Sequence, residues 1–209
     1  MLPVCMQIDL SSLSAGSVYH LMTQTVIPRP IAWVLTGDGT GCLNLAPFSY
    51  FTAVSSQPPV LLISVGKRPD GTAKDTHKNA ADTGRFVVHI AHSGLLDAVN
   101  DTAAPYAPDV SEIDALGLAT TQEPSWPLPR LIGPRISFSC AVHHIDPLGP
   151  QSLIFGQIEH VWIDDAVATH DAKGRLTVSA SAADPLSRLG ASQYASLGPV
   201  LARRRRTKL

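Results

Sequence analysis

The sequence predicts a mostly-β protein, a closed or nearly closed antiparallel β-barrel that carries a few short helices. Short apolar runs rich in β-branched and aromatic residues recur along the chain, and glycine and proline turns separate them. The GDG at 37–39 lacks the third glycine and the following helix of a dinucleotide-binding fold, which makes a Rossmann fold a poor alternative. The 209 residues, 44% of them hydrophobic, suffice for one core. We expect a single domain over 1–209, with its core over about 19–195.

The first elements are a short helix, a strand and a tight turn. Residues 11–22 carry spaced apolar residues and predict the helix. Residues 26–36 are apolar, interrupted by two prolines, and predict the strand. Residues 37–41, GDGTG, predict the turn, because glycine accepts a positive φ without strain.

The returning strand, residues 43–51 (LNLAPFSYF), is expected to be irregular. Pro47 removes a backbone donor, so this segment cannot be a regular central strand. Asn44 and Ser49 stand among apolar neighbours. This combination suits a ligand that needs a flat apolar contact together with a few hydrogen bonds.

The middle of the chain alternates strand and helix. Residues 60–65 form a β-rich run entered through two prolines, and residues 66–73 form a polar loop. Residues 74–82 predict a helix that ends near Gly84, a plausible residue for the position just after a helix. Residues 85–91 have the pattern of a buried strand.

The second half contains one long irregular segment among further short elements. A short helix is expected over 94–100, strands over 136–145, 153–163 and 176–180, and a closing helical turn over 184–194. Residues 103–134 are rich in proline and have few periodic apolar runs. A long excursion of this kind inside a compact domain is usually functional or a docking surface.

Charge and composition exclude several classes of protein. The net charge is −1, and the basic tail at 203–209 carries five positive charges, so the rest of the chain is mildly acidic and shows no nucleic-acid footprint. For the tail, a disordered terminus is favoured over a contact with RNA or an acidic partner. No apolar run approaches a membrane span and no secretory signal is visible, which predicts a cytoplasmic location without membrane attachment.

Cysteine and histidine give no metal site and no catalytic group. The three cysteines are far apart, which argues against a disulfide framework and against zinc chemistry. The eight histidines yield no ligand set, and satisfied structural histidines are the better interpretation. No Ser-His-Asp or Cys-His order stands out, so no catalytic acid or base is named. This fits an enzyme whose reactive atom belongs to a cofactor.

Several motifs together resemble a known family. RPIAWV, the Gly-rich turn, NLAPFSYF, the PP before the next strand and the later KDT are similar to the flavin reductase-like family, the flavoredoxin-like FMN-binding split barrels of Greek-key type. The match runs from about Tyr19 to Phe86 and continues more weakly through 136–163. Together these motifs are specific, whereas any one alone would be weak.

The resemblance implies a flavoprotein oxidoreductase. It implies FMN, with FAD as the alternative, and NADH or NADPH as the reductant. Electrons would pass to free flavin, oxygen or a partner oxygenase, and a homodimer would complete the flavin site. A flavin-binding electron carrier or sensor without nicotinamide turnover stays open as the alternative function.

The residues expected to hold the flavin fall into two groups. A phosphate needs amides at a helix start, a hydroxyl and a positive charge, which Lys74, Asp75 and Thr76 supply. Taken alone, this triplet is better explained as an ordinary helix cap, with Asp75 or Thr76 capping. In combination with NLAPFSYF, the phosphate interpretation is favoured. The strand residues expected to wrap the ring and the polyol, through amides around 46–49 and through side chains, are Asn44, Ala46, Pro47, Phe48 and Ser49. For Phe48, simple packing in the core is an equal alternative.

Further candidates rest mainly on the resemblance. Ser64 lies in the strand that faces the cofactor in related proteins, and Gly190 and Tyr194 resemble a recurring family ending near the flavin. A capped helix with a packed aromatic explains that ending equally well. Arg29, between two prolines, is expected to meet an anion or carbonyl groups near the flavin or the dimer seam. A structural salt bridge is an equal alternative for Arg29.

Overall fold

The structure, a computed structural model, describes residues 6–107 and 110–203. The prediction of a disordered basic tail therefore concerns residues that lie, apart from Arg203, outside the described part. Within that part no helix is both long and apolar enough to span a bilayer.

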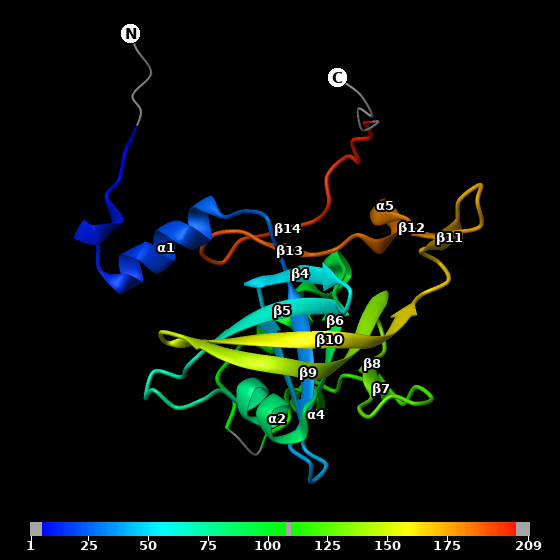
Figure 1. Cartoon of the computed structure of the whole chain (residues 1–209), viewed down its shortest axis with the longest axis horizontal. Helices are drawn as coiled ribbons and strands as arrows, with labels where there is room; N and C mark the ends of the chain where they lie inside the picture. The colour runs from blue at the N-terminus through cyan, green and yellow to red at the C-terminus, as the bar shows by residue number, and fades with distance from the viewer. Residues whose placement is uncertain (1–5, 108–109, 204–209) are drawn as a thin grey trace.

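A seven-stranded antiparallel sheet dominates the fold (Figure 1). Its order is β3-β2-β6-β9-β10-β5-β4. The strands are β2 (Ala32–Gly37), β3 (Leu43–Phe48), β4 (Phe51–Ser56), β5 (Pro59–Gly66), β6 (Arg85–Ile90), β9 (Ile136–Leu148) and β10 (Gln151–Ile163). The expected strands form with shifted ends: the segment 26–36 gives β1 and β2, and the segment 43–51 ends as β3 at Phe48. The strand β4 was not expected, and β9 and β10 are longer than expected.

The two edge strands of this sheet are consecutive in the chain. Only Ser49 and Tyr50 separate β3 from β4, and the Ser64 amide on β5 donates to the Tyr50 carbonyl at 2.8 Å. The sheet must therefore curl until its edges meet at this bend, which produces a barrel that is split between β3 and β4. The expected mostly-β barrel is confirmed.

Short strands and helices surround the barrel. The strands are β1 (Arg29–Pro30), β7 (Thr120–Thr121), β8 (Arg130–Leu131), β11 (Ala168–His170), β12 (Leu176–Val178), β13 (Ser187–Arg188) and β14 (Tyr194–Ala195). The helices are η1 (Leu10–Ser12), α1 (Ala15–Thr25), α2 (Asp75–Thr83), η2 (Ser93–Leu95), α3 (Leu96–Asp101), α4 (Glu112–Ala115) and α5 (Ala180–Ala183). In Figure 1, α1, β13 and β14 lie at one end of the molecule and α2 lies at the other.

Strand β2 is buried on both faces and separates two apolar clusters. Trp33 and Leu35 pack in one cluster with Leu45 and Leu131, while Ala32 and Val34 join the barrel interior. The period of two along a strand explains this division. Cys140 belongs to the barrel interior, as expected for a small core residue.

His89 on β6 is a satisfied structural histidine, as expected. Its Nδ1 lies 3.0 Å from the Trp33 carbonyl, and its Nε2 accepts from the Leu131 amide at 3.0 Å. Burial lowers the pKa of His89 to about 4, so the ring is neutral at pH 7. The ring thereby connects β8 to the central strands.

The prediction of a closing helical turn over 184–194 is wrong. The helix lies earlier, as α5, and ends where Asp184 adopts φ 47°. The following residues form the hairpin β13–β14, and Arg188 of β13 pairs with Arg29 of β1. This segment thus pairs with the backbone of β1 in a small sheet. The pairing is long-range, so spacing along the chain does not reveal it.

Candidate functional site

A cleft of about 330 Å³ opens between β3, the start of α2 and the segment that follows α3. This volume is in the range of small-molecule sites. The residues that line it are Asn44, Ala46, Pro47, Phe48, Arg68, Pro69, Lys74, Asp75, Thr76, Thr102, Ala103, Ala104, Pro105, Tyr106 and Glu112. The NLAPF and KDT motifs, which are far apart in sequence, therefore meet in one place.

The first turn of α2 faces this cleft without a side-chain cap. Lys74 occupies the N-cap position, and its side chain makes no capping hydrogen bond. The ordinary-cap alternative for the triplet is therefore not what the structure has. At the other end of α2, Gly84 adopts φ 70° and closes the helix, as expected. Uncapped amides and the helix dipole together attract an anion.

The charge and hydroxyl expected beside these amides are present. The Lys74 Nζ lies 5.7 Å from the centre of the Phe48 ring, so the ammonium stands over the apolar wall of the cleft. The Thr76 side chain is only 2% exposed, and its Oγ1 accepts from Asn44 Nδ2 at 3.0 Å. A hydroxyl whose oxygen already accepts keeps its proton available for an acceptor in the cleft.

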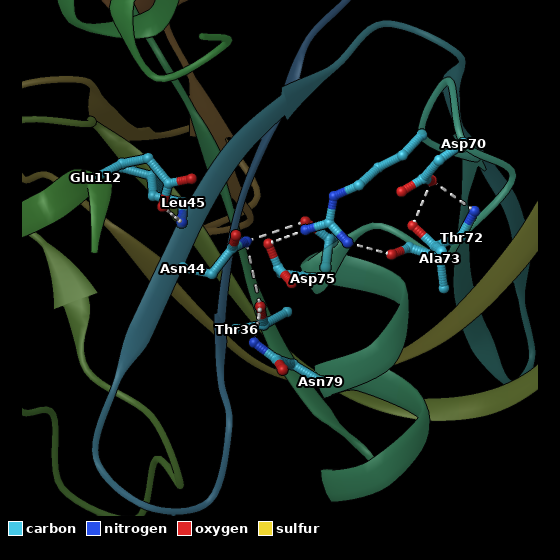
Figure 2. Close-up of polar contacts among 11 residues, drawn as sticks. Thr36, Asn44, Leu45, Asp70, Thr72, Ala73, Asp75, Asn79 and Glu112 are labelled. Atoms are coloured by element: carbon cyan, nitrogen blue, oxygen red, sulfur yellow. Dashed lines mark hydrogen bonds and ion pairs between the residues drawn. The ribbon is translucent and has the colours of Figure 1, made fainter. Parts of the chain in front are cut away.

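A small polar network fixes Asn44 beneath the cleft (Figure 2). Asn44 on β3 and Asn79 on α2 both donate to Thr36 Oγ1 on β2, at 3.4 and 3.3 Å. Thr36 is fully buried and Asn79 nearly so. The network joins the sheet to the helix and so holds the start of α2 against β3.

Asp75 contributes a negative charge that Arg68 neutralises. The Arg68 guanidinium forms an ion pair with the Asp75 carboxylate and also donates to the Ala73 carbonyl at 2.5 Å. Asp75 itself provides the first amide of α2, while its side chain holds Arg68 at the edge of the cleft. The cleft thus carries two cationic side chains, Lys74 and Arg68.

The outer edge of β3 explains the position of Pro47. The Leu45 amide points away from β2 and donates to Glu112 Oε2 at 2.8 Å (Figure 2). Since ladder bonds alternate along an antiparallel strand, Pro47 also faces outward, where its missing N–H breaks no pairing. Ala46 and Phe48 point their amides toward β2. Ala46, Pro47 and Phe48 therefore offer no backbone amide to a ligand, which is fewer donors than the sequence suggested.

Glu112 is a buried carboxyl in the wall of the cleft. It is only 6% exposed, and it stands at the start of α4, whose N-cap is Ser111. Burial raises the pKa of Glu112, and the charge of Asp75 acts in the same direction, while the Leu45 amide and the amide of Glu112 itself lower it. Sequence reasoning missed this residue because it lies in an irregular segment and resembles a helix-capping acid.

Five candidate residues lie outside the residues that line the cleft. Arg29 is 5% exposed and donates to the carbonyls of Thr23, Val26 and Leu189, at 2.7, 2.8 and 2.8 Å. Its Nε donates to Ser49 Oγ at 3.2 Å. Carbonyl partners were one of the expected alternatives, and in the described part of the chain no ion pair is formed. Arg29 therefore holds α1, the β3–β4 bend and the C-terminal hairpin together.

The remaining candidates also have partners elsewhere. Ser64 donates to Gln151 Oε1 at 3.3 Å. Gly190 is buried against Gln24, whose side chain would lie 2.0 Å from an added Cβ. Tyr194 donates to Asn100 Oδ1 at 3.4 Å, and the Arg188 guanidinium lies 4.3 Å from the centre of its ring.

The long excursion after α3 partly covers the cleft. Ala103 to Tyr106 and Glu112 line it, while β7 and β8 pair with each other farther along. Proline content indicated an irregular segment but not which residues face the ligand. Arg68 and Pro69, in the loop before α2, complete the lining.

The donor set of the cleft fits FMN. Uncapped amides, an ammonium and a hydroxyl suit a phosphate monoester. Pro47 and the small exposed part of Phe48 offer an apolar wall for a flat ring, while most of Phe48, 7% exposed, packs in the barrel interior. The outward edge of β3 leaves backbone groups for a polar rim. No group of three or more metal-binding side chains occurs within residues 6–107 and 110–203.

Comparisons with known proteins agree with this geometry. Residues 22–180 match the family described as flavin reductase like domain. The chain is 38% identical over 193 residues to the uncharacterized protein YwrF of Bacillus subtilis, covering 89% of this chain and 92% of that protein.

Two solved structures are similar over nearly the whole chain. Nitrilotriacetate monooxygenase component B from Bacillus cereus superposes with a TM-score of 0.88 at 32% identity, covering 96% of this chain and 99% of that one. A split-barrel protein from Shewanella frigidimarina superposes with a TM-score of 0.82 at 22% identity, covering 97% and 100%. The second likeness shows the fold alone, and that fold is the split barrel expected from the sequence.

Proposed function

The chain belongs to the flavin reductase like family, and on that premise we propose that it is an FMN-dependent oxidoreductase of the flavin reductase type. One observation carries the proposal: the uncapped start of α2, Lys74, Thr76 and the β3 wall converge on one cleft. FMN is favoured over FAD because the cleft offers one uncapped helix start for one terminal phosphate, that of α2, whereas the start of α4 is capped by Ser111. The same proposal takes residues 1–209 as one domain and the cytoplasm as its location.

The residues of the cleft bind and orient the cofactor. Lys74, Thr76 and the α2 amides hold the phosphate, and the Asn44–Thr36–Asn79 network keeps that cradle rigid. Pro47 and Phe48 exclude water from one face of the ring. Bound flavin supplies the redox chemistry, receiving electrons from NADH or NADPH and passing them to free flavin, oxygen or a partner oxygenase. The similarity to a monooxygenase component B supports the last acceptor.

The active unit in this proposal is a homodimer. Tyr19 and Met22 on α1 and Val54 on β4 are 62, 41 and 51% exposed, an apolar surface beside a hollow of about 260 Å³. The Tyr50 hydroxyl in the wall of that hollow is buried and has no hydrogen-bond partner among the described residues. A second copy would cover the apolar surface beside this buried hydroxyl. Light scattering that shows a strict monomer at micromolar concentration would contradict this assembly.

Reduction of the bound flavin tests the function. In a stopped-flow experiment, excess NADH or NADPH should bleach the flavin absorption at roughly 450 nm, a property of the oxidised cofactor. If dithionite bleaches the band while both nicotinamides leave it unchanged, the protein is a flavin-binding electron carrier or sensor. Comparison of NADH with NADPH in the same experiment identifies the donor.

A further inference from the structure

We infer that Glu112 is a binding residue for the hydroxyl groups of the flavin's ribityl chain, the polyol between the ring and the phosphate. This inference rests on the proposed function and deepens it. Glu112 lies in the long excursion, and neither the family motifs nor the expected phosphate and ring contacts involve it. Its carboxylate nevertheless lies in the wall of the same cleft.

Position along β3 is the first argument. The strand residues from Asn44 to Phe48 span about 13 Å, at about 3.3 Å per residue. Asn44 bonds Thr76 at the phosphate end, and Phe48, whose ring centre lies 5.7 Å from the Lys74 Nζ, lies at the opposite end of the strand. Glu112 meets β3 at Leu45, between the two. A molecule that lies along β3 with its phosphate at Thr76 therefore passes Glu112 before its ring reaches Phe48.

Charge is the second argument. A buried carboxylate is normally paired with a cation, yet Glu112 forms no ion pair within the described part of the chain. Arg68, the arginine in the lining, is bound to Asp75. A negative phosphate would be repelled by Glu112, so this carboxylate suits a neutral group that donates hydrogen bonds.

Hydrogen-bonding capacity is the third argument. An ionised carboxylate only accepts, at about four lone-pair sites. The Leu45 amide and the amide of Glu112 itself occupy part of that capacity. Vicinal hydroxyls are the usual partners of an acidic residue in a nucleotide site, as in ribose recognition. The ribityl chain presents such hydroxyls at the right point of the cleft.

A purely structural role is the competing explanation, since Glu112 also seals the open edge of β3. Glu112→Gln separates the two roles, because the glutamine oxygen still accepts from the Leu45 amide while the charge is lost. Asp114→Asn is the matched control: it removes the same charge from an exposed position of the same helix, α4. Thermal unfolding verifies that both variants are folded.

The test is a fluorescence titration with FMN, riboflavin and lumiflavin, whose ring carries a methyl group in place of the ribityl chain. Glu112→Gln should raise the dissociation constants of FMN and of riboflavin about fivefold each, which corresponds to the difference between a charge-assisted and a neutral hydrogen bond. Lumiflavin binding should not change, and Asp114→Asn should match wild type with all three ligands.

Each other outcome overturns a specific claim. If Glu112→Gln leaves FMN and riboflavin unchanged, or weakens all three ligands equally, Glu112 is structural and the proposed function stands. The wild-type protein gives an independent check that needs no variant to fold. If it binds lumiflavin as tightly as riboflavin, the hydroxyls contribute nothing and the inference fails. If wild type binds none of the three, the proposed function fails as well.

Discussion

The two ends of β3 use polar residues in opposite ways. At the Asn44 end, the α2 amides and the Thr76 hydroxyl remain directed at a cleft, and the Lys74 side chain extends along the cleft to Phe48. At the Ser49 end, Arg29 is buried and its guanidinium is engaged by three carbonyl groups and a serine hydroxyl. Sequence motifs placed both ends in one cofactor site.

This difference shows how to separate a binding residue from a structural one with the same chemistry. A cationic side chain whose donors are already satisfied by the protein stabilises the fold. A cation beside uncapped amides and a hydroxyl with an available proton forms a group of donors that can still bind a ligand. Substitutions at the first end should therefore change flavin affinity, and substitutions at the second should change stability.

The largest effect is expected for Arg29→Met. One buried and two partly buried carbonyls lose their donor, so the free energy of unfolding should fall by about 3 kcal/mol, measured by chemical denaturation. Arg188→Met is the control, because that guanidinium is partly exposed over Tyr194. Its loss should lower the free energy of unfolding by under about 0.5 kcal/mol. Weaker FMN binding by Arg29→Met without loss of stability would place Arg29 in the flavin site after all.

The second largest effect is expected for Lys74→Ala, which should lower flavin affinity and leave stability unchanged. FMN binding should weaken by about 1.5–3 kcal/mol, the range for a charge-assisted hydrogen bond, while riboflavin should bind wild type and variant almost equally. Calorimetry with both ligands measures this. Lys78→Ala, at an exposed position of the same helix paired with Asp82 at 3.3 Å, should leave both affinities unchanged. Equal losses for FMN and riboflavin would mean that Lys74 acts through the fold.

Thr76→Ala should have a smaller effect on the same ligand. Loss of one neutral hydrogen bond should weaken FMN binding by about 0.5–1.5 kcal/mol, again by calorimetry. Thr76→Ser keeps the hydroxyl and should retain wild-type affinity. If Thr76→Ser binds FMN as weakly as Thr76→Ala does, the packing of the methyl group determines affinity, and the hydroxyl is not a phosphate ligand.

The smallest effect is expected for Glu112→Gln, on the free energy of unfolding and its dependence on pH. Because burial raises the pKa of Glu112 above its unfolded value, the stability that this group contributes is present at low pH and is lost as pH rises through the raised pKa. Without flavin, Glu112→Gln should thus be more stable than wild type at pH 7, by roughly 0.5–1 kcal/mol. The difference should vanish below about pH 4, where glutamate is protonated in both states. A difference that is constant with pH would contradict the raised pKa.

Local patterns predicted most of the barrel strands, though not β4, and they named the NLAPF and KDT residues that line the cleft. NLAPF and KDT carry their own chemistry, and Gly84 marks the end of α2 through its positive φ. The closing hairpin depends on pairing with β1, and the role of Arg29 depends on carbonyls as far away as Leu189. Glu112 reaches Leu45 across 67 positions. Such partners are set by the tertiary fold, so spacing along the chain cannot reveal them.

A crystal structure of the protein with FMN tests the central claim most directly, because it shows which end of β3 receives the phosphate. The account predicts the phosphate at the first turn of α2, within hydrogen-bond distance of Lys74 and Thr76, and the ring toward Phe48. A phosphate bound instead beside Arg29 and Arg188 would contradict it, and the distinction between the two ends of β3 would fall with it.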